Sequence, residues 1–153
     1  MDSSLKEIYQ QVILDHNKSP RNYKVLTGAT NTAEGYNPLC GDHINIYAIV
    51  ENNIVTDLSF QGNGCAISKS SASIMTTVLK GKTVQEAEAL FNKFHDFIMG
   101  KLPADADISD LGKLAIFEGV KEFPVRIKCA TLAWHTVHSA LTGAGHVVST
   151  ETE

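Results

Sequence analysis

The 153-residue sequence lacks most features that mark specialised classes of protein. It has no apolar run of 18 residues, so it predicts no membrane-spanning helix. The N-terminal segment MDSSLKEIYQQVILDHN has neither a secretory apolar core nor an arginine-rich transit composition, and we therefore expect a cytoplasmic protein. A net charge of −4 and the lack of a dense Lys/Arg patch argue against nucleic acid as a partner.

Cysteine is also scarce, with three residues and no CxxC pair. An odd number fits poorly with a disulfide framework, and in a reducing cytoplasm thiols are more often buried, catalytic or metal-bound. The rest of the composition, 43% hydrophobic and 20% charged, is typical of one globular domain. A chain of this length can bury enough apolar surface to fold without a stabilising disulfide or metal ion. We therefore expect any bound metal to be functional.

Hydrophobic periodicity predicts the elements of this domain. Apolar residues alternate over 44–50 and again over 54–60, which predicts a hairpin that turns at Asn52 and Asn53. A further polar strand is expected over 29–36. The predicted helices cover residues 4–16, 65–80, 83–98, one or two short segments within 100–123, and 126–142. We expect the tail to be disordered from about residue 146.

Strands followed by helices indicate a single α+β domain over residues 1–153. In this domain a three-stranded antiparallel sheet packs against about five to six helices.

Each cysteine lies at a junction between predicted elements. Cys40 precedes the hairpin and Cys65 follows it, so the two thiols return to the same end of the sheet. Cys129 falls in the first turn of the last predicted helix, and its position relative to the other two does not follow from the sequence. A helix N-terminus favours the thiolate, which is the form that binds zinc or iron, and we expect this effect at both Cys65 and Cys129.

A fourth donor completes a metal-binding set. Asp42 lies two residues from Cys40 and offers an oxygen ligand, so that three thiolates and one carboxylate give a tetrahedral Cys₃Asp site. Arg126 and Lys128 would offset part of its negative charge. The alternative is that the cysteines act as small buried hydrophobes. None of them lies within an apolar stripe, which favours the metal site.

Four segments together resemble the iron–sulfur cluster scaffold family of IscU and the NifU N-terminal domain. They are YQQVILDHNKSPRN, GYNPLCGD, GNGCAISKSSAS and FPVRIKCATLAWHT, and the resemblance extends in order over nearly the whole chain. It implies a small α+β fold with a three-stranded antiparallel sheet. The family's metal-binding set corresponds to Cys40, Asp42, Cys65 and Cys129.

Three departures are similar to the SufU branch of that family. Lys128 stands where IscU-type scaffolds have histidine, EFPVRIK replaces their chaperone-docking motif, and the connector 100–123 is longer. The resemblance implies a bound Zn²⁺ and a PLP-dependent cysteine desulfurase of the SufS type as partner. A downstream Suf scaffold complex is a further expected partner.

The position of Cys40 between Pro38 and Gly41 suggests its chemistry. It is the ligand best able to leave the metal and accept persulfide sulfur, which would make the chain sulfurtransferase-like. Two alternatives stay open: a scaffold for a transient [2Fe–2S] or [4Fe–4S] cluster, and a purely structural zinc module. A zinc hydrolase ranks last, because four ligands leave no open position for water.

Several other polar residues are weaker candidates. His135 and His138 are spaced as a possible ligand pair, although packing or solvation is the commoner role of such histidines. His43 is expected on a surface strand or as a partner that orients a ligand. The serines of the Cys65 helix are expected to pack: Ser68, Ser70, Ser71 and Ser73. The resemblance, and no other observation, implies a role in docking of the desulfurase for four residues near the N-terminus: Tyr9, Asp15, His16 and Arg21.

Overall fold

The computed structural model describes residues 3–142 and 147–149, with side chains described from Lys6 to Thr142. The chain begins with helix α1 (Ser3–Lys18), and three strands follow. In chain order, the remaining elements are β1 (Asn31–Asn37), β2 (Asp42–Glu51), β3 (Ile54–Asn63), α2 (Ala66–Leu79), α3 (Val84–Ile98), the 3₁₀ segment η1 (Ser109–Glu122), α4 (Pro124–Leu141) and β4 (Val147–Ser149).

The first three strands form the predicted antiparallel sheet, in the order β3-β2-β1. The β2–β3 hairpin turns at Asn52 and Asn53, whose φ angles of 52° and 66° lie in the left-handed region that asparagine tolerates. Asn37 pairs with Asp42 at the opposite end, so residues 38–41 form the tight connection that carries Cys40. The predicted three-stranded antiparallel sheet packed on helices is therefore confirmed.

The C-terminal segment differs in part from the expectation of a disordered tail. Residues 143–146 and 150–153 lie outside the described residues, but Val147–Ser149 form β4 and pair in parallel with Glu34–Tyr36 of β1. The physical reason is that β1 would otherwise be an edge strand with unpaired backbone groups, which a passing segment can satisfy.

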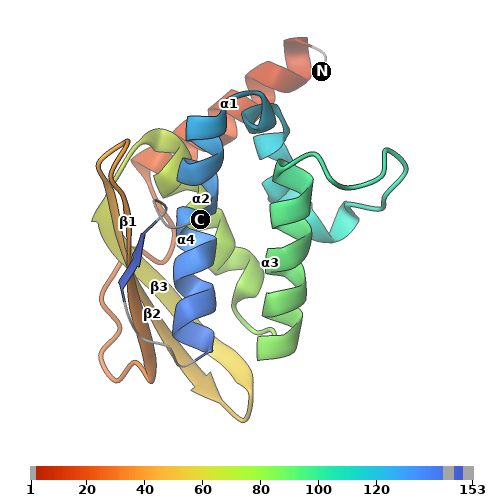
Figure 1. Cartoon of the computed structure of the whole chain (residues 1–153). Coiled ribbons are helices and arrows are strands. Elements are labelled where there is room, and N and C mark those ends of the chain that lie inside the picture. The colour runs from red at the N-terminus through yellow and green to blue at the C-terminus, as the bar shows by residue number, and fades with distance from the viewer. Residues whose placement is uncertain (1–2, 143–146, 150–153) are drawn as a thin grey trace.

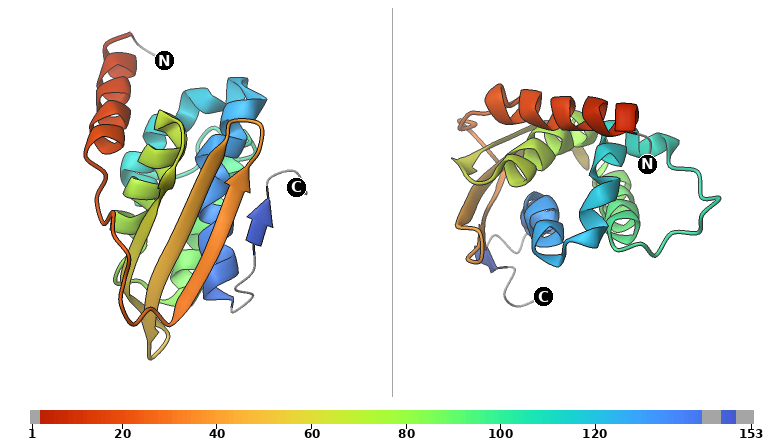
Figure 2. Two further views of the ribbon diagram at one scale, coloured as in Figure 1. Left: turned by 90° about the vertical axis from the view of Figure 1, so that its left-hand side faces the viewer. Right: turned by 90° about the horizontal axis from the view of Figure 1, so that it is seen from above.

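All the helices lie on one side of the sheet (Figure 1; Figure 2). Helices α2 and α4 pack directly on it, while α3 and η1 form a further layer and α1 lies across α2. The interior between these layers is apolar, and its largest fully buried side chains include Trp134, Phe60, Phe94 and Phe117.

A glycine in β1 allows α4 to approach the sheet closely. A Cβ atom on Gly35 would lie 2.1 Å from Oγ1 of Thr136 and 3.2 Å from Cδ1 of Leu132, both on α4. Any larger residue would push the helix away from the strand. Because Cys129 is carried by the same helix, this contact helps to fix the distance between Cys129 and the β1–β2 connection.

Two helices differ in detail from their predicted forms. Helix α4 begins at Pro124, two residues before its predicted start, because proline is well suited to the first helical position. Cys129 therefore lies in the second turn instead of the first. The connector contains the expected short helices, and η1 is broken at Gly112, whose φ of 54° is non-helical.

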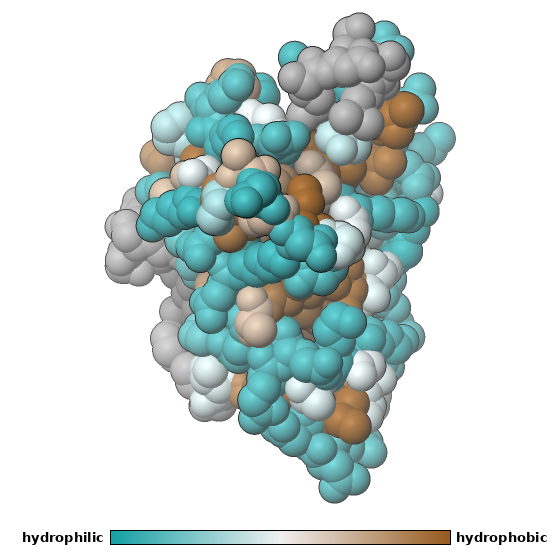
Figure 3. All heavy atoms as spheres, turned by 90° about the vertical axis from the view of Figure 1, so that its right-hand side faces the viewer, coloured by the Kyte–Doolittle hydropathy of each residue, from teal (hydrophilic) through white to brown (hydrophobic). Residues whose placement is uncertain are grey.

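The face of the molecule seen from the α3 side is mostly hydrophilic, with smaller apolar areas between the polar side chains (Figure 3). Among the described residues, no helix combines the length and the apolar character needed to cross a bilayer.

Candidate metal centre

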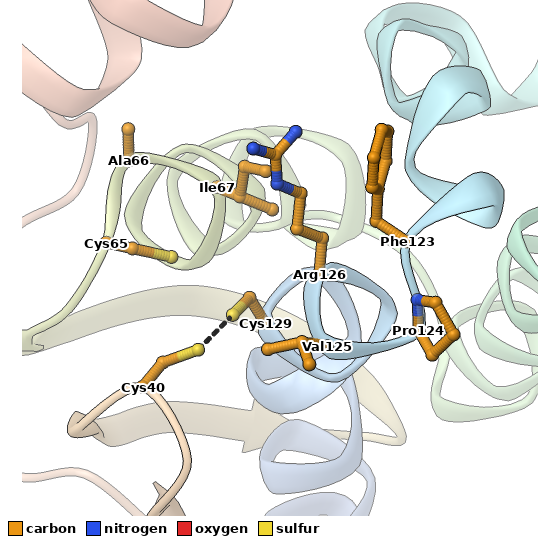
Figure 4. Close-up of a pocket in the computed structure, with 9 residues that line it drawn as sticks. All are labelled: Cys40, Cys65, Ala66, Ile67, Phe123, Pro124, Val125, Arg126 and Cys129. Carbon is orange, nitrogen blue, oxygen red and sulfur yellow. Dashed lines mark hydrogen bonds between the residues drawn. The ribbon is translucent and has the colours of Figure 1, made fainter.

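Three segments that are far apart in the sequence bring the three cysteines together at one end of the sheet (Figure 4). Cys40 lies in the exposed β1–β2 connection, Cys65 is the N-cap residue of α2, and Cys129 lies on α4 with 2% of its surface exposed. The Sγ atoms of Cys40 and Cys129 are 3.2 Å apart. The side chain of Cys65 points toward the same cluster and lines the same cavity as the other two thiols (Figure 4).

Asp42 contributes a buried carboxylate to the same cluster, with 1% of its surface exposed. Its Oδ1 accepts a hydrogen bond from the backbone N–H of Cys65 at 2.9 Å, and its Oδ2 accepts one from Asn37 at 3.2 Å. Gly64 makes room for it, because a Cβ there would lie 2.8 Å from Oδ1. These two donors are neutral, and burial of an ionised carboxylate is costly unless it is paired or binds a metal.

The donor set fits a thiophilic metal ion. The ligand atoms of Cys40, Asp42 and Cys129 all lie within 4.8 Å of one another. Cys65 lines the same cavity and supplies a third thiol beside Cys129. Three sulfur donors with one carboxylate suit Zn²⁺ or an iron–sulfur cluster, whereas calcium and magnesium require oxygen ligands.

The surroundings shift the pKa values of two of these thiols in opposite directions. The neighbouring Cys129 side chain lowers the pKa of Cys65 to about 6 against the effect of burial, and the backbone N–H of Ser68 at the start of α2 lowers it further. The predicted helix-start effect at Cys65 is therefore confirmed.

At Cys129 the same prediction is wrong. The neighbouring Cys65 side chain, burial and the thiol of Cys40 raise the pKa of Cys129 well above its ordinary value. The reason is structural, because α4 begins five residues before Cys129 and the effect of a helix terminus fades within one turn.

Asn37 is a polar residue of the site that the sequence reasoning missed. It is fully buried at the end of β1, and its Nδ2 lies 3.2 Å from Oδ2 of Asp42 and 3.4 Å from Sγ of Cys129. It therefore connects two of the donors. A signal was present in the strand, because Asn37 continues the alternating buried positions of Ala33 and Gly35.

A groove of about 530 Å³ opens directly onto the three thiols. Its walls are mainly apolar and come from the starts of two helices: Ala66 and Ile67 of α2, and Pro124, Val125 and Arg126 with the preceding Phe123 at the start of α4. The guanidinium of Arg126 lies over the ring of Phe123, 4.6 Å from its centroid. Arg126 therefore places a positive charge at the groove, which agrees with the expectation that it offsets part of the negative charge of the donor set.

The remaining histidine candidates lie apart from the thiols. His138 and His135 pack around Phe91 of α3, and Nδ1 of His138 is 2.6 Å from a carboxylate oxygen of Glu88. His43 stacks on Tyr36 and points away from the buried side of β2, where its neighbour Asp42 lies.

The serines of α2 pack in the interior, as expected: Ser68, Ser70, Ser71 and Ser73 are all buried. Ser71 donates to the carbonyl of Ala130 at 2.6 Å, and Trp134 donates to Ser71 at 3.3 Å. These bonds hold α2 against α4, the two helices that carry Cys65 and Cys129.

The N-terminal candidates make structural contacts around the end of α1. Buried His16 hydrogen-bonds to the hydroxyl of Ser73 at 2.7 Å, and Arg21 forms an ion pair with Asp15 at 2.7 Å. Tyr9 is partly buried against the core. The structure leaves their expected role in docking untested.

A small α+β domain with a Cys₃Asp cluster at the end of its sheet defines a class of thiolate metal-binding proteins. The model of the NifU-like N-terminal domain family matches residues 8–141. The chain belongs to this family, as the sequence motifs predict.

Individual relatives agree with that assignment. The chain is 41% identical over 140 residues to the zinc-dependent sulfurtransferase SufU of Bacillus subtilis, covering 92% of this chain and 93% of the relative. It is 38% identical over 140 residues to the iron–sulfur cluster assembly scaffold protein IscU of Streptococcus pyogenes, covering 91% and 86%. The crystal structure of a SUF-system assembly scaffold protein from Fervidobacterium islandicum is similar, with a TM-score of 0.81 and 34% identity over 88% of this chain and 97% of that one.

Proposed function

We propose that this protein acts in iron–sulfur cluster biogenesis as a zinc-dependent acceptor and carrier of persulfide sulfur. The observation that carries the proposal is the exposed Cys40, whose Sγ lies 3.2 Å from buried Cys129 within a four-donor cluster. The similarity to a relative named a zinc-dependent sulfurtransferase supports it.

The ligands of Zn²⁺ in this proposal are Cys40, Asp42, Cys65 and Cys129. When bound, the ion keeps the thiols deprotonated and shields them from oxidation. The chain itself orients the set: the N–H of Cys65 and the side chain of Asn37 hold the carboxylate of Asp42 in place. Helices α2 and α4 fix Cys65 and Cys129, whereas Cys40 is held by the short exposed connection at 38–41.

Cys40 is the sulfur acceptor because it alone of the three cysteines is exposed. Its thiolate attacks the terminal sulfur of a persulfide on the donor enzyme. The new bond joins Cys40 Sγ to that sulfur, the donor's S–S bond breaks, and the donor cysteine leaves as a thiolate. The product is a persulfide on Cys40, and no external oxidant or reductant is consumed.

The donor in this proposal is a PLP-dependent cysteine desulfurase of the SufS type. The groove beside Cys40 is open, and exposed apolar side chains at Phe123 and Val125 line its rim. Such a surface suits a persulfide-bearing segment of a protein partner better than a free polar metabolite. A downstream Suf scaffold complex would then receive the sulfur. Free thiols of this kind persist in a reducing compartment, which supports the cytoplasm as the proposed site of the reaction.

A second function, that of a scaffold for a transient [2Fe–2S] or [4Fe–4S] cluster, is favoured by the same three thiols and by the resemblance to scaffold proteins. Visible absorption separates the two functions. A scaffold acquires the absorption of iron–sulfide charge transfer when supplied with iron and sulfide, whereas a zinc-dependent carrier stays colourless.

Removal of the metal tests the third possibility, a structural zinc module. The apolar interior between sheet and helices is extensive, so we expect a chelator to leave the far-ultraviolet circular dichroism and a cooperative thermal transition in place. Unfolding on chelation would indicate a structural zinc.

The decisive experiment incubates the protein with a cysteine desulfurase and cysteine, followed by peptide mass spectrometry without reductant. We expect a gain of about 32 Da on the Cys40 peptide, the mass of one sulfur atom. The C40S variant should gain none. A persulfide that appears first on Cys65 or Cys129, or at an unchanged rate in C40S, would contradict the proposal.

A further inference from the structure

The closest contact between two thiols in the described structure joins the proposed sulfur acceptor to a buried neighbour. Cys129 donates its S–H to Sγ of Cys40 across 3.2 Å (Figure 4). A disulfide needs the two sulfur atoms at about 2.05 Å, so an approach of about 1.2 Å would join them. Cys129 is fixed on α4, and the exposed connection that carries Cys40 supplies the movement.

We propose that Cys129 is the resolving thiol for a persulfide on Cys40 and releases its outer sulfur as hydrosulfide. This inference rests on the proposed function, which supplies the persulfide. It assigns to Cys129 a chemical step in addition to its place among the metal ligands.

The step is balanced without any further reactant. The sulfur of Cys129 attacks Sγ of Cys40, and a new S–S bond forms between the two cysteines. The bond from Cys40 to the terminal sulfur breaks, and its electron pair leaves with that sulfur. Cys129 gives its proton to solvent and attacks as the thiolate, and the departing sulfur takes up a proton from solvent, so that Cys40–S–S⁻ and Cys129–SH become a Cys40–Cys129 disulfide and HS⁻. The sulfane sulfur is reduced, and the two cysteines are oxidised.

The direction of approach favours attack on the inner sulfur atom. Displacement at sulfur requires the attacking, central and leaving atoms to lie nearly in line. Cys129 lies on the buried side of Cys40, where it also contacts Asn37. Cys40 itself is exposed to solvent in the β1–β2 connection, whereas Cys129 is buried. The step requires the delivered sulfur atom on the side of Cys40 away from Cys129, and the exposure of Cys40 to solvent leaves room for it there.

Cys65 is less suited to this step, although it lies in the same cluster. Its thiol accepts a hydrogen bond from the backbone N–H of Ser68 at 3.4 Å, whereas the thiol–thiol hydrogen bond joins Cys129 and Cys40. The three donors that all lie within 4.8 Å of one another are Cys40, Asp42 and Cys129, and Cys65 does not belong to this set. Cys65 thus provides a matched control, because its loss damages the same donor set without removing the thiol nearest to Cys40.

When Cys129 is engaged as a metal ligand it is not available for the attack. The inference therefore predicts that the persulfide is retained while the site holds its ion and is discharged when the site opens. Sulfide would then leave this protein only at the stage at which the ligand set is released.

The test loads the zinc-bound protein with persulfide, removes the desulfurase, and adds a chelator under anaerobic conditions without thiol reductants. The wild type should release close to one sulfide per persulfide, and non-reducing peptide mapping should show a Cys40–Cys129 disulfide. C129S should retain its persulfide and release sulfide at least about tenfold more slowly. C65S should still form the Cys40–Cys129 disulfide. Equal release by C129S and the wild type, or a Cys40–Cys65 disulfide, would overturn the inference.

The failure of the proposed function would look different. In that case the desulfurase would place no sulfur on Cys40 at the loading step. The persulfide is then introduced on the reduced, metal-free protein with a small inorganic polysulfide, and the same three proteins are compared. A Cys40–Cys129 disulfide with sulfide release still supports the resolving role, and a stable persulfide in the wild type refutes it.

Discussion

Replacement of Gly64 by alanine tests whether Asp42 is a metal ligand. The added Cβ would lie 2.8 Å from Oδ1 and 3.3 Å from Cγ of Asp42. Ordinary van der Waals contact begins near 3.4 Å, so the carboxylate oxygen has to retreat by about 0.6 Å. Metal sites tolerate ligand displacements of about 0.2 Å. The same movement stretches the 2.9 Å bond from the N–H of Cys65.

We therefore expect Gly64→Ala to weaken zinc binding by about 10- to 100-fold, the usual effect of disturbing a group that orients a ligand. This corresponds to about 1.4–2.8 kcal/mol. The assay is competition for zinc with a chromophoric chelator. Gly119→Ala is the control, because its Cβ would have no neighbour within 4 Å.

The thermal unfolding of both variants without metal shows whether the fold is intact. We expect Gly119→Ala to remain within about 0.5 kcal/mol of the wild type, as surface substitutions usually do. If Gly64→Ala unfolds normally and binds zinc within about twofold of the wild type, the reasoning that makes Asp42 a positioned ligand is wrong.

Three further predictions concern the surroundings of the site. Gly35→Ala should destabilise the fold by about 1–3 kcal/mol in chemical denaturation, because its Cβ overlaps Oγ1 of Thr136, and the added change Thr136→Ala should recover part of this loss; additive losses would contradict the contact. Asn37→Asp should weaken zinc binding by about 10- to 100-fold in the competition assay, since it replaces the donor to Asp42 with a second carboxylate, and unchanged affinity would refute the role of Asn37. Burial lowers the pKa of His16, so below its ordinary value of about 6.5 the unfolded chain takes up a proton that the folded chain does not. The free energy of unfolding should then fall as the pH falls, by up to about 1.4 kcal/mol per pH unit, and His16→Gln should flatten this slope; an equal slope in both proteins would contradict the buried, neutral histidine.

The parts of the fold that depend on local pattern could be predicted from the sequence. Alternation of apolar residues gave the β2–β3 hairpin, and the two asparagines at its turn adopt the left-handed conformation expected of them. Helix α3 begins at Val84, close to the predicted start at residue 83, and Thr83 and Glu86 form a capping box there with both of its hydrogen bonds made. Neighbouring residues determine these features, so no tertiary information was needed.

Features that depend on contacts between distant segments could not be predicted. Helix α4 packs across β1 because Gly35 leaves space for it, and this packing brings Cys129 beside Cys40. Asn37 acquires its role only when that helix is in place. The raised pKa of Cys129 has the same origin, because the cause lies in Cys65 and in burial instead of its own helix.

The pairing of β4 with β1 also depends on tertiary structure. A three-residue segment carries too little pattern to identify it as a strand. The exposed edge of β1 determines its conformation, and the short length of the segment explains why disorder was expected there.

X-ray absorption at the zinc edge of the purified protein tests the central claim most directly. The account predicts three sulfur ligands at about 2.3 Å and one oxygen ligand at about 2.0–2.2 Å. In C40S the sulfur count should fall to two. A first shell with imidazole nitrogen, or with fewer than three sulfur atoms in the wild type, would contradict a centre built from Cys40, Asp42, Cys65 and Cys129.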